Sequence, residues 1–200
     1  LPFMTKKDAD DGLEITKKVA EAIYKETGEY YKGIMYGGFI VTKDGVKLLE
    51  YNARFGDPEA MNVLPLMESD FVGICSSIIN QQLQTAKIKF QRKATVCKYV
   101  VPVSYVGYEV DGIKNQKIEI GKISADARLY YAAVDKREDG LYLTPSRAIG
   151  FVGIADDLGK AERIAEEATK SVKGKVYHRE DIGTKKLVYM RINHMKHVLR

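Results

Sequence analysis

Three polar side chains stand at alternate positions, Glu50, Asn52 and Arg54, directly after an apolar run. Side chains two positions apart on a β-strand point to the same face, so Glu50 and Asn52 project together and Tyr51 points the other way. Carboxylate and amide oxygens are hard ligands of the kind that Mg²⁺ takes beside water and nucleotide phosphate. The forked guanidinium of Arg54 suits a phosphate or a carboxylate. Taken alone, this spacing occurs more often at ordinary solvated strand ends than at binding sites. The surrounding elements must therefore decide whether the three residues form a site.

The residues before this triplet predict a β-hairpin. Residues 33–42 and 46–51 are apolar and rich in strand-forming types, and an Asp-Gly pair separates them. Asp-Gly between two such runs is a strong hairpin signal, because both residues tolerate the positive φ of a tight turn. Gly37 and Gly38 interrupt the first run, which indicates either a close approach to the backbone or a bulge.

A helix is expected on the N-terminal side of the hairpin, over residues 6–27. Thr5 followed by Asp8 resembles a capping box, apolar residues recur at helical spacing, and Gly28 supplies a stop.

A loop and a broken helix are expected after the hairpin. Residues 52–59 contain a glycine and a proline, and Pro58 suits the first turn of a helix because its missing N–H has no helical partner there. Pro65 should interrupt this helix, and Asp70 should cap its restart. The restarted helix is expected to turn inward Phe71, Ile74, Cys75, Ile78 and Ile79.

Beyond a polar stretch the sequence predicts a second domain. We place the boundary inside this stretch, which gives domains over residues 1–85 and 86–200. The second domain is expected to be α+β, with one mostly antiparallel sheet and one helix, over residues 157–172, laid across it. An Asp-Gly pair at positions 139 and 140 predicts another hairpin. The expected strands cover residues 94–103, 117–123, 127–134, 141–144 and 148–154.

A longer run of residues carries a family resemblance. The run EYNARFGDPEA, residues 50–60, resembles the metal-binding signature of ATP-grasp ligases. Its second half is similar to that of phosphoribosylamine–glycine ligases, which also share features with residues 31–38, 67–71 and 179–183. The resemblance covers nearly the whole chain and is loosest between about residues 85 and 145.

The resemblance implies a fold and a reaction. The fold is α+β: the distal part of an ATP-grasp module, with antiparallel strands and helices, followed by a smaller α+β C-terminal domain. The implied reaction joins glycine to 5-phosphoribosylamine through glycyl phosphate, with ATP as co-substrate, and gives glycinamide ribonucleotide, ADP and phosphate.

The resemblance also assigns residues. Glu50 and Asn52 match the family's ligands of Mg²⁺ or Mn²⁺, the ion that binds the nucleotide phosphates. Arg54 matches a position that faces the reacting phosphates, and Asp57 and Glu59 lie in the turn that lines the substrate side.

The sequence departs from the family in two respects. Gly37, Gly38 and Phe39 occupy the strand position where the family sometimes has a further carboxylate ligand. Residues 1–30 contain neither the lysine-bearing, glycine-rich hairpin that covers the phosphates nor a strand that grips adenine. We therefore expect a fragment that is inactive alone and pairs with the N-terminal half of the same enzyme. Two alternatives stay open, namely another ATP-grasp ligase or carboxylase, and a non-catalytic binding or assembly module with the same fold.

Composition excludes several other classes. The 32 basic and 27 acidic residues give a net charge of +5, but no basic run of five or more occurs, so nucleic acid is not indicated. No apolar run approaches the ~20 residues that cross a bilayer, so we expect no membrane contact and a cytoplasmic location. Cys75 and Cys97 lie in apolar stretches and are expected to be buried. We expect His194 and His197 to be surface residues.

Overall fold

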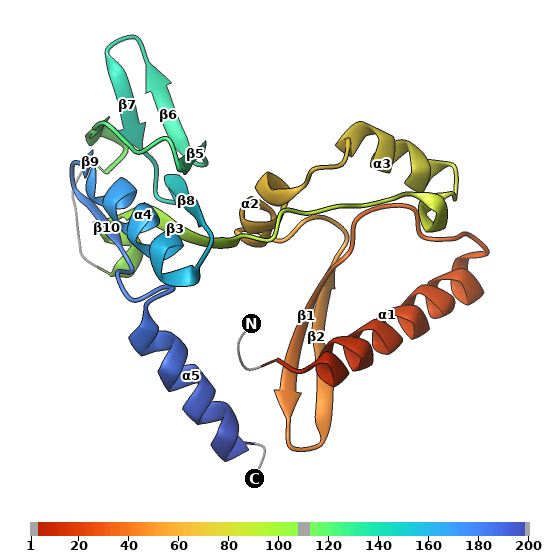
Figure 1. The fold of residues 1–200 in the computed structure, drawn as a ribbon. Helices are drawn as coiled ribbons and strands as arrows, with labels where there is room; N and C mark the ends of the chain where they lie inside the picture. The colour runs from red at the N-terminus through yellow and green to blue at the C-terminus, as the bar shows by residue number, and fades with distance from the viewer. Residues whose placement is uncertain (1–3, 108–112, 199–200) are drawn as a thin grey trace. The chain divides into compact units, whose positions relative to one another are not determined.

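The computed structural model describes residues 4–107 and 113–198, and the chain divides into two compact units (Figure 1). Both contain helices and antiparallel strands, so the expected α+β class is confirmed. The assignment of residues 1–85 and 86–200 to two parts of a ligase stays a prediction. Unit 1 consists of residues 1–60, 67–91 and 188–200, and unit 2 of residues 61–66 and 92–187.

Helix α1 (Lys6–Thr27) in unit 1 has the bounds that the sequence predicts. The Thr5 hydroxyl accepts a hydrogen bond from the Asp8 amide at 3.2 Å, and the Asp8 carboxylate accepts one from the Thr5 amide at 2.8 Å. Gly28 ends the helix in the left-handed conformation, with φ 75°, and its amide donates to the Tyr24 carbonyl. These contacts satisfy terminal backbone groups that the helix itself leaves unpaired.

Strands β1 (Tyr36–Thr42) and β2 (Gly45–Asn52) form the predicted antiparallel hairpin. Gly45 has φ 96° in the turn, a conformation that glycine adopts without steric cost. The register shifts next to Gly38, which is the bulge that the paired glycines indicated.

The helix after the hairpin is broken where the sequence predicts. Helix α2 (Glu59–Val63) leads into a 3₁₀ turn (Leu64–Leu66) that contains the proline, and helix α3 (Phe71–Ile79) follows. The Asp70 carboxylate accepts hydrogen bonds from two backbone N–H groups in the first turn of α3, which is the expected cap.

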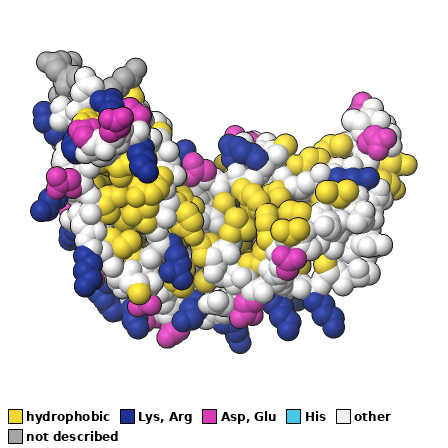
Figure 2. All heavy atoms as spheres, turned by 90° about the horizontal axis from the view of Figure 1, so that it is seen from above, with side chains coloured by type: hydrophobic (Ala, Val, Ile, Leu, Met, Phe, Trp, Pro, Cys, Tyr) yellow, Lys and Arg dark blue, Asp and Glu magenta, His cyan; other side chains and the backbone are white. Residues whose placement is uncertain are grey.

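Helix α3 turns fewer side chains inward than predicted. Ile74 is buried, but Phe71 is 39% exposed and Ile79 is 66% exposed. Cys75 is half-buried rather than buried. Hydrophobic side chains therefore reach the surface of unit 1, as the yellow spheres in the right half of Figure 2 show.

Unit 2 contains two four-stranded antiparallel sheets, so the prediction of a single sheet was wrong. The expected strand over residues 127–134 divides at Ala132 and Ala133, whose amides donate to the carbonyls of Ala148 and Arg147. The sheets have the orders β10-β3-β8-β5 and β6-β7-β4-β9. The strands are β3 (Ala94–Pro102), β4 (Lys117–Ile120), β5 (Ala127–Tyr131), β6 (Val134–Arg137), β7 (Gly140–Leu143), β8 (Ile149–Ala155), β9 (Val172–Lys173) and β10 (Val176–His178).

The core of unit 2 lies between helix α4 (Leu158–Lys170) and the sheet that contains β3 and β8. Ile149 and Phe151 are completely buried there. Helix and sheet approach closely at Gly153, where an added Cβ would lie 2.0 Å from the Ala161 carbonyl oxygen. Helix α4 can therefore pack this closely on the sheet only because Gly153 has no side chain.

The end of the chain contains two elements that the sequence did not indicate, strand β10 and helix α5 (Lys185–Val198). His194 and His197 on α5 are exposed, as expected, and Cys97 in β3 is buried. In the described ranges, none of the helices combines the length and the apolar character that a membrane crossing requires. Three further 3₁₀ turns cover Leu83–Thr85, Val103–Val106 and Ile113–Asn115.

The same substitution at two glycines should have opposite effects on stability. Gly153→Ala should lower the free energy of unfolding by about 3 kcal/mol, because a backbone carbonyl occupies the place of the new methyl group. Gly12→Ala in α1 should raise it by up to about 1 kcal/mol, because alanine favours the helix, and its Cβ would meet the Phe39 ring at an ordinary 3.9 Å. Urea denaturation of both variants checks this, and equal effects would contradict the packing described here.

Candidate functional site

The three predicted side chains at the exit of β2 form a hydrogen-bonded row. The Asn52 amide nitrogen donates to Glu50 Oε1 at 3.1 Å, and an Arg54 guanidinium nitrogen donates to Asn52 Oδ1 at 3.2 Å. The second guanidinium nitrogen donates to the Phe55 carbonyl at 2.7 Å. Glu50 and Arg54 are exposed and Asn52 is half-buried. The structure thus brings a carboxylate, an amide and a guanidinium together at an open surface.

Helix α1 occupies the other face of the hairpin. The Tyr51 hydroxyl lies 2.6 Å from the Thr16 hydroxyl of α1, and the Phe39 ring lies against Gly12. Phe39 and Tyr51 also contact each other edge to face, with ring centroids 6.0 Å apart. A Cβ at Gly37 would lie 2.6 Å from one of these rings and 2.7 Å from the other, so only glycine fits between them.

The β-bulge decides which side chains of β2 face α1. Phe39 pairs with Leu48, whereas Gly38 pairs with Glu50, which leaves Leu49 as an extra residue. Directly opposed residues of an antiparallel pair share a face, so Leu48 lies on the α1 side together with Phe39. In a regular strand Glu50 would follow Leu48 onto that side. The extra residue reverses the alternation, and the carboxylate reaches the open face.

A hollow of about 690 Å³ lies beside Glu50. Leu49 is 67% exposed at its edge, so the hollow combines an apolar wall with the charged end of the row. It is lined by Met4, Tyr36, Gly37, Gly38, Phe39, Leu49 and Glu50.

The turn after the row adds a second carboxylate. Gly56 is buried, and an added Cβ there would lie 2.5 Å from Glu59 Oε2 and 2.8 Å from the Tyr36 ring. Burial first, then a hydrogen bond to Glu59 and the charges of Glu59 and Glu50, raise the pKa of Tyr36. Asp57 is exposed in the same turn. Glu59 therefore lies beside Tyr36.

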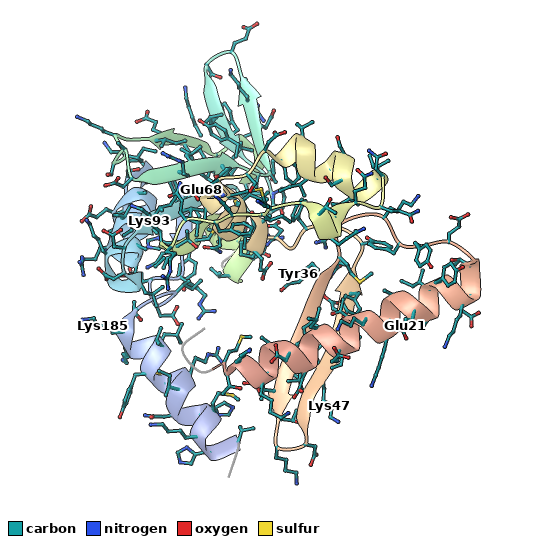
Figure 3. The ribbon with its side chains drawn as sticks, turned by 45° about the vertical axis from the view of Figure 1, so that its right-hand side comes forward. Glu21, Tyr36, Lys47, Glu68, Lys93 and Lys185 are labelled. Carbon is teal, nitrogen blue, oxygen red and sulfur yellow. The ribbon has the colours of Figure 1, made fainter. Side chains whose placement is uncertain are left out.

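Sequence reasoning missed Tyr36 as a member of this site. It lies at the start of β1, at the end of the hairpin away from Lys47 (Figure 3). It pairs with Asn52 across the ladder and so shares the face of the row. The signal was available, because Tyr36 belongs to the same run of residues 31–38 that carries the family resemblance.

Comparison with known proteins shows what the chain resembles. The family described as "Phosphoribosylglycinamide synthetase, ATP-grasp (A) domain" matches residues 1–60, which include the whole row and the turn. The phosphoribosylamine–glycine ligase of Methanocaldococcus jannaschii is 48% identical over 200 residues, which is all of this chain and 45% of that protein. The one from Methanothermobacter thermautotrophicus is 49% identical over 199 residues, which is 98% of this chain and 44% of that protein. The resemblance to the phosphoribosylamine–glycine ligases is confirmed. The chain spans less than half the length of these relatives and matches their C-terminal part.

Solved structures show the same fold. The phosphoribosylamine–glycine ligase of Thermotoga maritima superimposes with a TM-score of 0.70 at 22% identity, over 91% of this chain and 45% of that chain. The biotin carboxylase domain of Hydrogenobacter thermophilus 2-oxoglutarate carboxylase, solved with MgADP and bicarbonate, gives 0.60 at 17% identity, over 97% of this chain and 40% of that chain. At these identities the likeness concerns the fold alone, and the expected fold is confirmed.

The late motif shared with phosphoribosylamine–glycine ligases, residues 179–183, holds a buried lysine in unit 2. Lys98 on β3 is completely buried, and its ammonium group donates to the Glu180 carbonyl at 2.8 Å. It also donates to Glu162 at 2.8 Å and to Glu166 at 2.5 Å, both on α4. A buried charge is tolerated when its hydrogen bonds are satisfied in this way. The motif therefore contributes a backbone acceptor that helps to fasten sheet and helix.

The same network contains a group of possible metal ligands, Glu166, His178 and Glu180. Glu166 Oε1 already lies 3.0 Å from the Lys170 ammonium and 3.1 Å from the His178 ring nitrogen. With Lys98 on its other oxygen, Glu166 is surrounded by cations that would repel a metal ion. The cluster is better explained as an ion-pair network.

This network should make the free energy of unfolding depend on pH in the acid range. Burial alone would raise the pKa of Glu166, but hydrogen bonds from Lys98, Lys170 and His178 outweigh it and hold the pKa at about 2. A lowered folded-state pKa contributes stability that is present above the unfolded pKa and is lost as pH falls through the folded pKa. We therefore expect a loss of up to about 3 kcal/mol between about pH 5 and pH 2 from this group.

Urea denaturation across this pH range, with Glu166→Gln as the variant, checks the expectation. The stability difference between the parent and Glu166→Gln should shrink as pH falls, because protonation makes the two chains alike. Glu167→Gln, at an exposed position on the same helix, is the matched control and should follow the parent. A Glu166→Gln difference that is constant with pH would contradict the assignment.

Proposed function

We propose that this chain is the C-terminal part of an ATP-dependent ligase that joins glycine to 5-phosphoribosylamine. The observation that carries the proposal is the hydrogen-bonded row of Glu50, Asn52 and Arg54 on the open face of β2. The row lies within a match of 48% identity to a phosphoribosylamine–glycine ligase. The products are glycinamide ribonucleotide, ADP and phosphate.

The reaction has two steps whose atoms balance. A carboxylate oxygen of glycine attacks the γ-phosphorus of ATP, the bond to the β-phosphate oxygen breaks, and ADP leaves. The amine of phosphoribosylamine then attacks the acyl carbon of glycyl phosphate, loses a proton and expels phosphate. Phosphoryl transfer needs positioning and charge stabilisation rather than a protein nucleophile. Arg54 supplies a permanent positive charge for the phosphoryl oxygens in the first step.

The donor set at the end of β2 fits Mg²⁺ or Mn²⁺. Glu50 and Asn52 present a carboxylate and an amide oxygen side by side, and these hard ligands suit either ion. Bound there with ATP, the ion would neutralise charge on the phosphates. Asn52 Oδ1 now accepts a hydrogen bond from Arg54, so we expect the guanidinium to leave it and turn to the phosphates. The MgADP in the carboxylase of similar fold supports this role.

The turn after the row suits the amine-bearing substrates. Glu59 is held close to Tyr36 beside the row, and the family resemblance assigns Asp57 of the same turn to the substrate side as well. A carboxylate accepts hydrogen bonds from an amine or ammonium group, which both glycine and phosphoribosylamine carry. We assign these two residues to substrate binding.

The fragment should be inactive alone and active when complemented. Residues 1–30 lack the nucleotide-gripping elements of the family, so we expect this chain alone to hold ATP poorly. The complemented enzyme combines this chain with the N-terminal portion of the Methanocaldococcus jannaschii relative. We expect ADP release that depends on both glycine and phosphoribosylamine only in this mixture. Failure of a folded, associated mixture to release ADP would remove the support for a ligase.

Loss of either proposed metal ligand should abolish turnover. In the complemented enzyme, Glu50→Ala and Asn52→Ala should each lower kcat by about 100-fold or more, because the charge on the phosphates is no longer neutralised. The melting temperature should change little, since both side chains stand on the open face. Lys47→Ala, at an exposed position near the turn of the same hairpin, is the control and should keep full activity. Activity within a few-fold of the parent in both variants would refute the metal assignment.

Arg54→Lys should also be costly. Lysine keeps the charge but cannot reproduce the forked pair of donors that we expect Arg54 to turn to the phosphates. We expect kcat of the complemented enzyme to fall by about tenfold or more. Steady-state kinetics with saturating ATP checks this, and an unchanged kcat would show that a point charge suffices.

A further inference from the structure

We infer that Tyr36 is a positioning residue that holds the Glu59 carboxylate toward the amine-bearing substrates. The inference rests on the proposed function, and it adds a residue to which neither the spacing of polar residues nor the family signature gives a role. The hydroxyl group of Tyr36 carries this role, because the ring alone would only fill space. Three features of unit 1 carry the inference.

The first feature is the absence of a side chain at Gly56. A Cβ there would stand within 3 Å of both Glu59 Oε2 and the Tyr36 ring, so the carboxylate and the ring close over one buried backbone position. Gly56 is buried while its neighbours Phe55 and Asp57 are not. Because no other residue leaves this space empty, the turn is shaped so that Glu59 folds back toward Tyr36.

The second feature is the register of the hairpin. Tyr36 pairs with Asn52, two positions from the Gly38 and Glu50 pair, so all of these residues share one face. Tyr36 therefore lies beside the row while it contacts the turn. It connects the side that would carry the nucleotide with the side that would carry the amine.

The third feature is the charge around the phenol. Burial, then a hydrogen bond to Glu59 and the charges of Glu59 and Glu50, raise the pKa of Tyr36. A phenol O–H is a donor and a carboxylate only accepts, so the hydrogen bond between the two side chains runs from Tyr36 to Glu59. A carboxylate that accepts such a bond is restricted in direction but keeps lone pairs for a further donor. A substrate amine is a donor of this kind.

These features give the carboxylates of Glu50 and Glu59 different roles. Glu50, bonded to Asn52, faces the phosphate side, and Glu59, fixed by Tyr36, faces the substrate side. Loss of the Tyr36 hydroxyl should therefore affect the affinity for an amine substrate and leave the affinity for MgATP unchanged. A purely structural tyrosine would affect all substrates alike through stability.

Tyr36→Phe in the complemented enzyme tests the inference. The ring that packs on Gly56 is kept, and only the hydroxyl is lost. We expect the KM for glycine or for phosphoribosylamine to rise about tenfold, as for loss of one hydrogen bond to a charged group. The KM for MgATP should stay within twofold, and the melting temperature should stay within about 2 °C, since only one partly exposed bond is lost. An unchanged KM for both amine substrates, or an equal rise for all three substrates, overturns the inference.

Tyr31→Phe is the matched control. Tyr31 belongs to the same run of residues, but its hydroxyl donates to the Ile34 carbonyl at 2.8 Å. We expect this variant to lose some stability with no selective change in any KM. A selective rise equal to that of Tyr36→Phe would overturn the inference, because the effect would then not require contact with Glu59.

A double-mutant cycle shows whether Tyr36 acts through Glu59. Glu59→Gln alone should raise the KM for the same amine substrate, and Tyr36→Phe should add little to it, because its target is already altered. Additive effects overturn the inference. If Tyr36→Phe fails to fold, Gly56→Ala is the second variant, because its methyl group displaces the Glu59 carboxylate. It should give the same selective rise, and a uniform loss overturns the inference.

The outcome is distinct from that of the proposed function. Absence of ADP release in the parent mixture defeats the ligase proposal before any variant is made. An active parent with no selective effect in these variants defeats only the role of Tyr36.

Discussion

The alternation of side chains along β2 is the constraint on which the site depends. Helix α1 needs one face of the hairpin for Phe39, Leu48 and Tyr51, and the chemistry needs the other. A regular strand could not place both Leu48 and Tyr51 against the helix, because they differ by an odd number of positions. The extra residue at Leu49 resolves this conflict, and it also directs Glu50 away from the helix. Packing and function are thus reconciled by one inserted residue.

Local signals predicted most elements of the fold. The capping box at Thr5 and the glycine at Gly28 fixed both ends of α1, and the Asp-Gly pair fixed the hairpin. The errors arose where tertiary structure overrides local pattern. The apolar run over residues 127–134 looks like one strand, but Ala132 and Ala133 pair with a neighbouring segment, and the residues before and after them belong to different sheets. The inward face expected for α3 was wrong in part because Phe71 and Ile79 remain exposed.

The part of the site whose residues are regularly spaced along the sequence could be predicted. Glu50, Asn52 and Arg54 follow one another at a period of two, so a single strand assumption groups them. Tyr36 joins them through a ladder register and through the empty position at Gly56, neither of which is a property of nearby residues in sequence. Lys98 was a signal that went unused, since a lysine within an apolar strand requires buried partners. Those partners lie on α4 and in the motif near residue 180.

The division of the chain into units has a consequence for dissecting it. The polypeptide passes from one unit to the other four times, after residues 60, 66, 91 and 187. A single cleavage at any of these passages leaves unit 1 composed of two separate polypeptides. Neither truncation nor proteolytic trimming at one point can therefore yield unit 1 as an intact, continuous piece. A minimal version of the β2 site must be built by rejoining distant segments through new linkers.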